Sequence, residues 1–173
     1  MDALKCIYSR RSIRAYKTNY RVTDEMINNL LSAGCSAPSA HNGKPWEFIV
    51  IKERETIEKL AKVKVYYEKP LKDAHVAIIV LIDPESSTKA RLDYKYQDCA
   101  AATQNILLAA TAQGLGSCWM GGLLDKPEMD NLKEILEIPD NIIPFGLISI
   151  GFPDETKEAK GKIDESKVHY EKY

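Results

Sequence analysis

The chain has 173 residues, of which 45% are hydrophobic and 28% charged, and its formal net charge is −1. This composition predicts a single globular domain over residues 1–173, and the near-zero charge excludes a global field that would attract nucleic acid or an anionic membrane. The N-terminus lacks a signal-peptide pattern, and the longest apolar stretch, Val76–Ile82, is far shorter than the ~20 residues of a membrane-spanning helix, so we expect a cytoplasmic protein.

In the first third of the chain we expect two helices and a strand. A short helix over residues 2–9 precedes an extended or irregular segment over 13–20. Thr23 is a good N-cap for the second helix, which carries an apolar stripe and which Gly34 can end. After a loop rich in Ser, Pro, Asn and Gly, Trp46–Ile51 is expected to be a strand.

The rest of the chain alternates helices and strands at irregular intervals. Helices are expected over residues 56–65, over 92–113 with Gly114 as its cap, and over a segment with Pro127 in its first turn; strands are expected over Val76–Ile82 and residues 144–150. Val76–Ile82 is apolar on both faces, which indicates a central strand. The irregular intervals favour an α+β fold with a mixed central sheet over a regular βαβ repeat. The charged tail over residues 155–173 has no core of its own and could extend over a neighbouring chain.

Cysteines and histidines are scattered along the chain rather than clustered. No two of the four cysteines have a CxxC spacing, and the three histidines stand alone. Structural zinc requires clustered ligands, so we expect no metal site. The cysteines are interpreted as reduced, mostly buried thiols.

A basic run near the N-terminus is the first candidate site. Arg10, Arg11 and Arg14 surround Ser12 directly after the first expected helix. Guanidinium groups bind phosphate through paired hydrogen bonds and stay charged at any working pH. On its own, however, such a run is more typical of a solvated basic surface.

Two loop segments are further candidates. Residues 37–46 place a hydroxyl, an amide and an aromatic ring in a loop that leads into a strand. Residues 114–122 end in Gly121 and Gly122, where the backbone can approach a flat ligand without obstruction by a Cβ. They do not form a GxGxxG fingerprint, because Trp119 replaces the last glycine and the segment follows a helix, so a Rossmann site is rejected. On their own both segments are typical of ordinary connections, and Asp98 is more typical of a solvated or capping carboxylate than of a catalytic acid.

Together and in this order, these segments resemble the nitroreductase family of flavoproteins. The resemblance rests on residues 10–14, 37–46, 98–116, 119–122 and 148–153, and so spans nearly the whole chain. It implies a mainly antiparallel sheet flanked by helices, FMN as a tightly held cofactor, NADH or NADPH as electron donor, and a homodimer with the flavins at the subunit interface.

The resemblance also implies a role for individual residues. Arg10, Arg11 and Ser12 correspond to phosphate and ribityl contacts, and Arg14 to the cation beside flavin N1 and the C2 carbonyl. Contacts from the partner subunit correspond to Pro38, Ser39, Ala40 and Asn42. Gly121 and Gly122 correspond to the backbone over the ring, with an N–H near flavin N5, and Lys160 and Lys162 to late phosphate ligands. No catalytic acid or base is implied.

The implied activity is a ping-pong, two-electron reduction of nitroaromatic, quinone or similar small acceptors by NAD(P)H. Two alternatives stay open: a specialised family activity such as reductive dehalogenation, and a flavin-binding or redox-sensing module without turnover. Lys44 stands where the family usually has glutamine, and the short segments over residues 65–74 and 89–94 imply a reduced lid over the active site.

Overall fold

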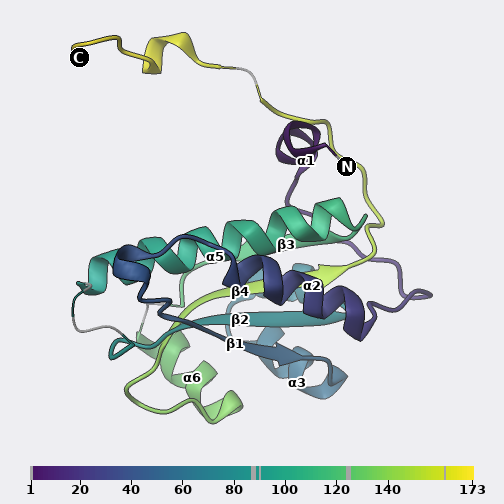
Figure 1. Ribbon diagram of the computed structural model, residues 1–173. Helices are drawn as coiled ribbons and strands as arrows, with labels where there is room; N and C mark the ends of the chain where they lie inside the picture. Colours follow the sequence, from purple (N-terminus) through teal and green to yellow (C-terminus); the bar gives the residue numbers. More distant parts are fainter. Residues whose placement is uncertain (1, 87–88, 90, 124–125, 162) are drawn as a thin grey trace.

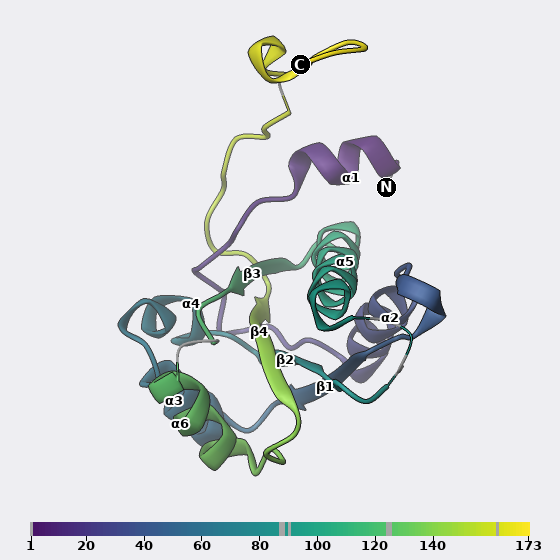
Figure 2. The ribbon, with the colours of Figure 1, turned by 90° about the vertical axis from the view of Figure 1, so that its left-hand side faces the viewer.

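A central antiparallel sheet lies between two layers of helices in the computed structural model, which describes residues 2–86, 89, 91–123, 126–161 and 163–173. The layers are seen along the sheet in Figure 2, with α2 and α5 on one face and α3 and α6 on the other. The first helix α1 (Ala3–Ser9) and the C-terminal tail lie outside these layers, beyond α5 (Figure 1).

The described strands pair in the order β1-β2-β4-β3, with bounds β1 (Trp46–Ile51), β2 (Val76–Ile82), β3 (Gly116–Met120) and β4 (Ile143–Gly151). All three pairings are antiparallel, and Ser12 adds an isolated parallel bridge to Ser117 of β3. Every residue of β2 is buried, because β2 lies between two strands and under helices on both faces. The central position expected for this strand is therefore confirmed, as is the mainly antiparallel sheet.

The first face of the sheet is covered by α2 (Asp24–Cys35) and α5 (Leu92–Ala112). The Thr23 hydroxyl accepts a hydrogen bond from the Met26 N–H, which confirms the expected N-cap of α2. Helix α5 is buried along its length, and its buried side chains include the small and apolar Ala102, Ile106 and Ala110. It ends at Ala112, and Gly114 follows the C-cap residue with a φ of 75° that is favourable for glycine.

The second face of the sheet is covered by shorter elements. They are α3 (Arg54–Ala61), the 3₁₀ turn η2 (Val65–Tyr67), α4 (Glu68–Leu71) and α6 (Lys126–Leu136). Leu60, Leu71 and Leu132 pack from these helices into one apolar cluster with β2 and β4. This face therefore holds η2 close to the end of β3, which matters for the site described below.

Three local predictions are corrected by the structure. Helix α2 does not end at Gly34 but continues to Cys35. A Cβ at Gly34 would lie 3.1 Å from side-chain atoms of Ile106 and Phe48, so this glycine allows close packing instead of ending the helix. The helix expected over residues 56–65 begins and ends earlier, at Arg54–Ala61. The sequence does not predict strand β3, since the glycine-rich segment in which it lies is typical of a turn.

The tail after β4 runs away from the body of the protein (Figure 1). Residues 163–173 are exposed and include only one short 3₁₀ turn, η3 (Glu165–Lys167). Among the described residues, no helix has the length and apolarity needed to cross a membrane, and no group of three or more His, Cys, Asp or Glu side chains is arranged to hold a metal ion.

Candidate functional site

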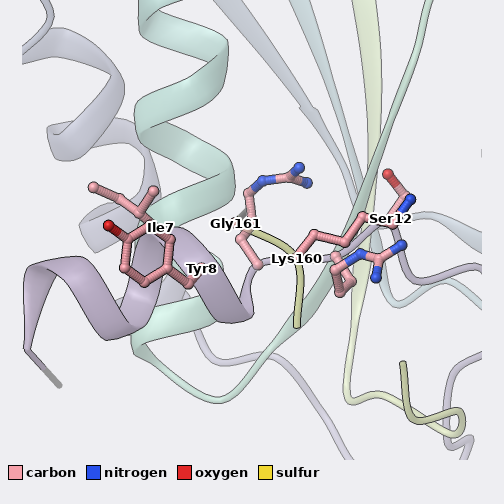
Figure 3. Close-up of a pocket in the computed structure, with 7 residues that line it drawn as sticks. Ile7, Tyr8, Ser12, Lys160 and Gly161 are labelled. Atoms are coloured by element: carbon pink, nitrogen blue, oxygen red, sulfur yellow. The ribbon is translucent and has the colours of Figure 1, made fainter. Parts of the chain in front are cut away.

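A basic pocket lies where the tail crosses the C-terminal end of α1. Its volume is about 470 Å³, and it is lined by Ile7, Tyr8, Arg10, Arg11, Ser12, Lys160 and Gly161 (Figure 3). The tail is joined to α1 by a hydrogen bond from the Lys160 N–H to the Tyr8 carbonyl oxygen, 3.2 Å long. Three cationic side chains and the hydroxyls of Tyr8 and Ser12 thus line a single opening, and no carboxylate is among the described residues that line it.

The segment that runs from the pocket to Ile13 is fixed to the sheet and to the tail. The Ile13 N–H donates to the Ser117 carbonyl oxygen of β3 at 2.9 Å, and the Lys157 ammonium donates to the Ser12 carbonyl oxygen. The Arg11 guanidinium donates to the Glu158 carbonyl oxygen of the tail. Because these contacts join three distant parts of the chain, the basic run is held in place rather than free in solvent.

Arg14 follows this segment and lies next to a carboxylate. Its backbone N–H donates to Glu155 Oε1 at 2.5 Å, and Lys157 lies 2.9 Å from the same oxygen. Desolvation disfavours the charged form of Glu155, but these two contacts outweigh it and hold the pKa of the carboxyl below its ordinary value. The Arg14 side chain itself is exposed, so its guanidinium is available to a bound anion or polarised ring.

The cysteine beside this region is not an activated nucleophile. Cys118 of β3 is buried, and burial raises the pKa of its thiol in spite of the nearby Arg14 and Lys157 cations. The thiol therefore stays protonated near neutral pH. Cys118 is therefore not assigned a role as a catalytic base.

The loop over residues 37–46 is held by the buried carboxylate of Asp98. The Ala40 N–H donates to Asp98 Oδ1 at 3.0 Å, and the Ser39 hydroxyl accepts from the Lys44 N–H at 3.0 Å. His41, Asn42 and Lys44 have positive φ values of 52°, 54° and 45°. Such conformations persist in non-glycine residues only where neighbouring contacts hold them. Asp98 is thus a capping carboxylate that shapes this loop.

This loop lies far from the basic pocket of the same chain. Ala40 contacts α5 at Asp98, whereas α1 contacts α5 near its other end, where the Cys6 thiol donates to the Leu108 carbonyl oxygen at 3.2 Å. Residues 98 and 108 are about 15 Å apart along the helix axis. Pro38, Ser39, Ala40 and Asn42 are therefore not brought together with the basic run in one chain.

Gly121 and Gly122 follow directly after β3 and are exposed. A Cβ at Gly121 would meet no atom within 4 Å, so its backbone is open to a flat ligand. Gly122 has a φ of 81°, and a Cβ there would lie 2.2 Å from the Tyr66 hydroxyl. Glycine is required at this position for both reasons.

Comparison with known proteins gives the same family that the sequence resembles. The family model described as the nitroreductase family matches residues 7–152. The chain belongs to the nitroreductase family. A protein of Archaeoglobus fulgidus, provisionally named NADH dehydrogenase/NAD(P)H nitroreductase, is 42% identical over 99% of both chains.

Solved structures of family members have the same fold. A provisionally named NADH oxidase of Clostridium acetobutylicum matches with a TM-score of 0.90 and 41% identity, over 97% of this chain and 99% of its own. An FMN-dependent nitroreductase of Clostridium difficile matches with a TM-score of 0.88 and 31% identity, over 98% and 99%. The family fold expected from the sequence is thereby confirmed.

The residues that the family resemblance singled out fall into three places in this nitroreductase fold. Arg10, Arg11, Ser12 and Lys160 line the basic pocket, and Arg14 lies two residues beyond it in the chain. The loop at 38–42 lies at the other end of α5, and Gly121 and Gly122 follow β3. Lys162 lies outside the described residues. Sequence reasoning missed Lys157 and Glu155, which contact Ser12 and Arg14, because nothing in a charged tail indicates which residues fold back.

Replacing Asp98 with alanine is expected to destabilise the protein by about 1–3 kcal/mol, because the Ala40 N–H loses its buried acceptor. Urea denaturation at a fixed protein concentration measures this change. Asp98→Asn is the matched control, since an amide oxygen can still accept this hydrogen bond. Equal stability of the alanine variant and the parent would contradict the assigned role of Asp98.

Proposed function

We propose that this nitroreductase-family chain is an FMN-dependent oxidoreductase that uses NADH or NADPH to reduce nitroaromatic, quinone or similar small acceptors. The observation that carries the proposal is the basic pocket in which Arg10, Arg11, Lys160 and Ser12 converge. Among structural neighbours, a nitroreductase of Desulfovibrio desulfuricans in complex with FMN, 29% identical with a TM-score of 0.87, and the FMN-dependent enzyme of C. difficile support FMN as the cofactor.

The residues present fit such a cofactor at both of its ends. A phosphate would be matched by guanidinium, ammonium and hydroxyl donors, which are the groups that bind phosphate best in proteins. A flat ring would be matched by the open backbone at Gly121, where no Cβ or neighbouring atom intrudes. Arg14, exposed beside this region, would place a positive charge near the pyrimidine side of the ring.

A homodimer would complete this site. The loop at residues 38–42 contacts α5 about 15 Å along the helix axis from the place where α1 contacts it, so it does not reach the basic pocket of its own chain. A second copy of the chain could bring its loop there. Apolar side chains of α1 and the tail are also left exposed, among them Leu4, Ile7 and Ile163. Their burial in a subunit interface would remove this apolar surface from water.

Bound FMN would supply the two-electron chemistry, taking hydride from the nicotinamide and giving it to the acceptor. The chain's own residues would bind and tune it. Arg10, Arg11 and Lys160 hold the phosphate, while Arg14 stabilises negative charge that develops at the N1 and C2 carbonyl side of the ring. No side chain is assigned a proton-transfer role, and the thiol of Cys118 stays protonated.

The test is to load the purified protein with FMN and to add NADH or NADPH without oxygen. Loss of the flavin absorbance and its return when a quinone or nitroaromatic compound is added are expected. Tight FMN binding without bleaching by either nicotinamide would instead support a flavin-binding or redox-sensing module. Failure to bind FMN would overturn the proposal.

Replacing Arg14 with alanine is expected to lower the two-electron midpoint potential of the bound flavin while most of the binding is kept. A cation ~4 Å from the reduced ring contributes up to ~4 kcal/mol at an effective dielectric constant of ~20, which corresponds to roughly 90 mV. Solvent screening reduces this value, so we expect a decrease of some tens of millivolts. Spectroelectrochemical titration measures it, and an unchanged potential would refute the tuning role of Arg14.

A further inference from the structure

Two adjacent tyrosines hold the backbone carbonyl group that precedes Gly122. The hydroxyls of Tyr66 and Tyr67, both in η2, donate hydrogen bonds to the Gly121 carbonyl oxygen at 2.9 Å and 2.7 Å. A carbonyl oxygen has two lone pairs, so it can accept both hydrogen bonds. The two rings meet edge to face, with centroids 4.9 Å apart and planes at 89°, and thus approach the oxygen from different directions.

The tyrosine pair is itself anchored to the body of the protein. Tyr67 is fully buried and belongs to the apolar cluster under the second face of the sheet. Tyr66 is about half exposed, but the Lys64 ammonium lies 5.6 Å from its ring centroid and 3.4 Å from Glu128 Oε1 of α6. The carbonyl group is therefore held by one buried side chain and by a second side chain that Lys64 contacts.

Fixing this carbonyl also fixes an N–H group. In a trans peptide the C=O of Gly121 and the N–H of Gly122 belong to one plane and point in opposite directions. Since both hydroxyls hold the oxygen on the η2 side, the Gly122 N–H points away from η2. The Tyr66 hydroxyl also lies only 2.2 Å from the position that a Cβ of residue 122 would take, so the two could not both be accommodated.

We propose that Tyr66 and Tyr67 are positioning residues that set the orientation of the Gly121–Gly122 peptide, so that its N–H and not its carbonyl faces the flavin. This inference rests on the proposed function, in which this backbone contacts the flavin near N5. The two tyrosines act through the peptide and need no contact with the cofactor.

The orientation of this peptide has a redox consequence. N5 of the oxidised ring accepts a hydrogen bond, so an N–H beside it favours the oxidised form. N5 of the reduced ring carries a proton and would be favoured by a carbonyl instead. Without the two hydroxyls the peptide can turn, so oxidised FMN loses affinity relative to reduced FMN and the midpoint potential rises.

The experiment compares Tyr66→Phe, Tyr67→Phe and the double variant with the parent, each loaded with FMN. Phenylalanine keeps the ring packing and removes only the hydroxyl. Tyr20→Phe is the control, because Tyr20 is a similarly exposed tyrosine that packs on Phe152 and lies outside the site. The measurements are the FMN dissociation constant, the two-electron midpoint potential and the thermal unfolding midpoint of the flavin-free protein.

For the double variant we expect oxidised FMN to bind about three- to tenfold more weakly, as the loss of hydrogen bonds of ordinary strength predicts. A tenfold change in the ratio of oxidised to reduced affinity corresponds to about 30 mV, so the potential should rise by up to that amount. Each single variant should show a smaller shift, and Tyr20→Phe none.

The outcomes separate this inference from the function on which it rests. If the double variant and Tyr20→Phe both match the parent in affinity and potential, the positioning role is wrong while the proposed function stands. A lower unfolding midpoint with an unchanged potential would assign the two hydroxyls a purely structural role and also overturns the inference. If the parent does not bind FMN at all, the proposed function itself fails. Should the double variant not fold, Tyr66→Phe decides alone, because Tyr66 is half exposed and its hydroxyl is not part of the core.

Discussion

An Arg10→Ala variant is expected to bind FMN about ten- to a hundredfold more weakly than the parent. Arg10 lines the basic pocket, and a charge-assisted hydrogen bond contributes roughly 1.5–3 kcal/mol. Its backbone N–H donates to the Cys6 carbonyl oxygen at the end of α1, and alanine keeps that bond. Fluorescence titration of the flavin-free protein with FMN measures the change.

Arg21→Ala is the control for the loss of one positive charge, since Arg21 is exposed and lines a different part of the surface, next to the start of α2. It should bind FMN as the parent does. Equal affinities for the Arg10 variant and the parent would show that the phosphate does not lie in this pocket. Riboflavin, which lacks the phosphate, should bind the parent and Arg10→Ala equally well.

Removing residues 163–173 is expected to abolish both the proposed dimer and tight FMN binding. Hydrogen bonds, an ion pair and a ring stack join residues within this segment, and Ile163 and Tyr170 are 71% and 84% exposed. Burying large apolar side chains on a partner would contribute roughly 1.5–3 kcal/mol each. The loss of two or more corresponds to a dissociation constant raised by about a hundredfold or more.

The truncated chain keeps the tail contacts of Glu155, Lys157 and Lys160, so the basic pocket is left intact. Sedimentation velocity and FMN titration at several protein concentrations are the measurements. A full-length Ile163→Ser, Tyr170→Ser variant should show the same change in weaker form. A truncated chain that stays dimeric and retains flavin would show that the tail does not complete the site.

Sequence patterns determined most of the core of this protein. Strands β1 and β2 have the bounds that their apolar patterns predict, and the N-cap Thr23 and the C-terminal Gly114 mark helix ends correctly. These features depend on neighbours in the chain: hydrophobic period, capping chemistry and the φ preference of glycine. Local physics suffices for them, which is why they can be predicted from one sequence.

Strand β3 shows where that approach fails. Gly116–Met120 begins with a glycine and lies between Gly114 and the Gly121–Gly122 pair, and so many glycines are not typical of a strand. It becomes one because β4 lies beside it with Leu147 and Ile148 opposite Met120 and Trp119, so strand pairing overrides local preference. Gly34 fails for the same kind of reason, because Ile106 and Phe48 close over it.

The candidate site, too, could be predicted from the sequence only in part. The basic run, the loop at 38–42 and the glycine pair could be found in the sequence, because each is a short segment with its own chemistry, and their roles toward FMN stay predictions. Only the tertiary structure decided that Lys160 joins Arg10 and Arg11 in one pocket, that Asp98 shapes the distant loop, and that Tyr66 and Tyr67 hold Gly121. Each of these contacts joins residues more than fifty positions apart, and such contacts are set by how helices and strands pack rather than by local sequence.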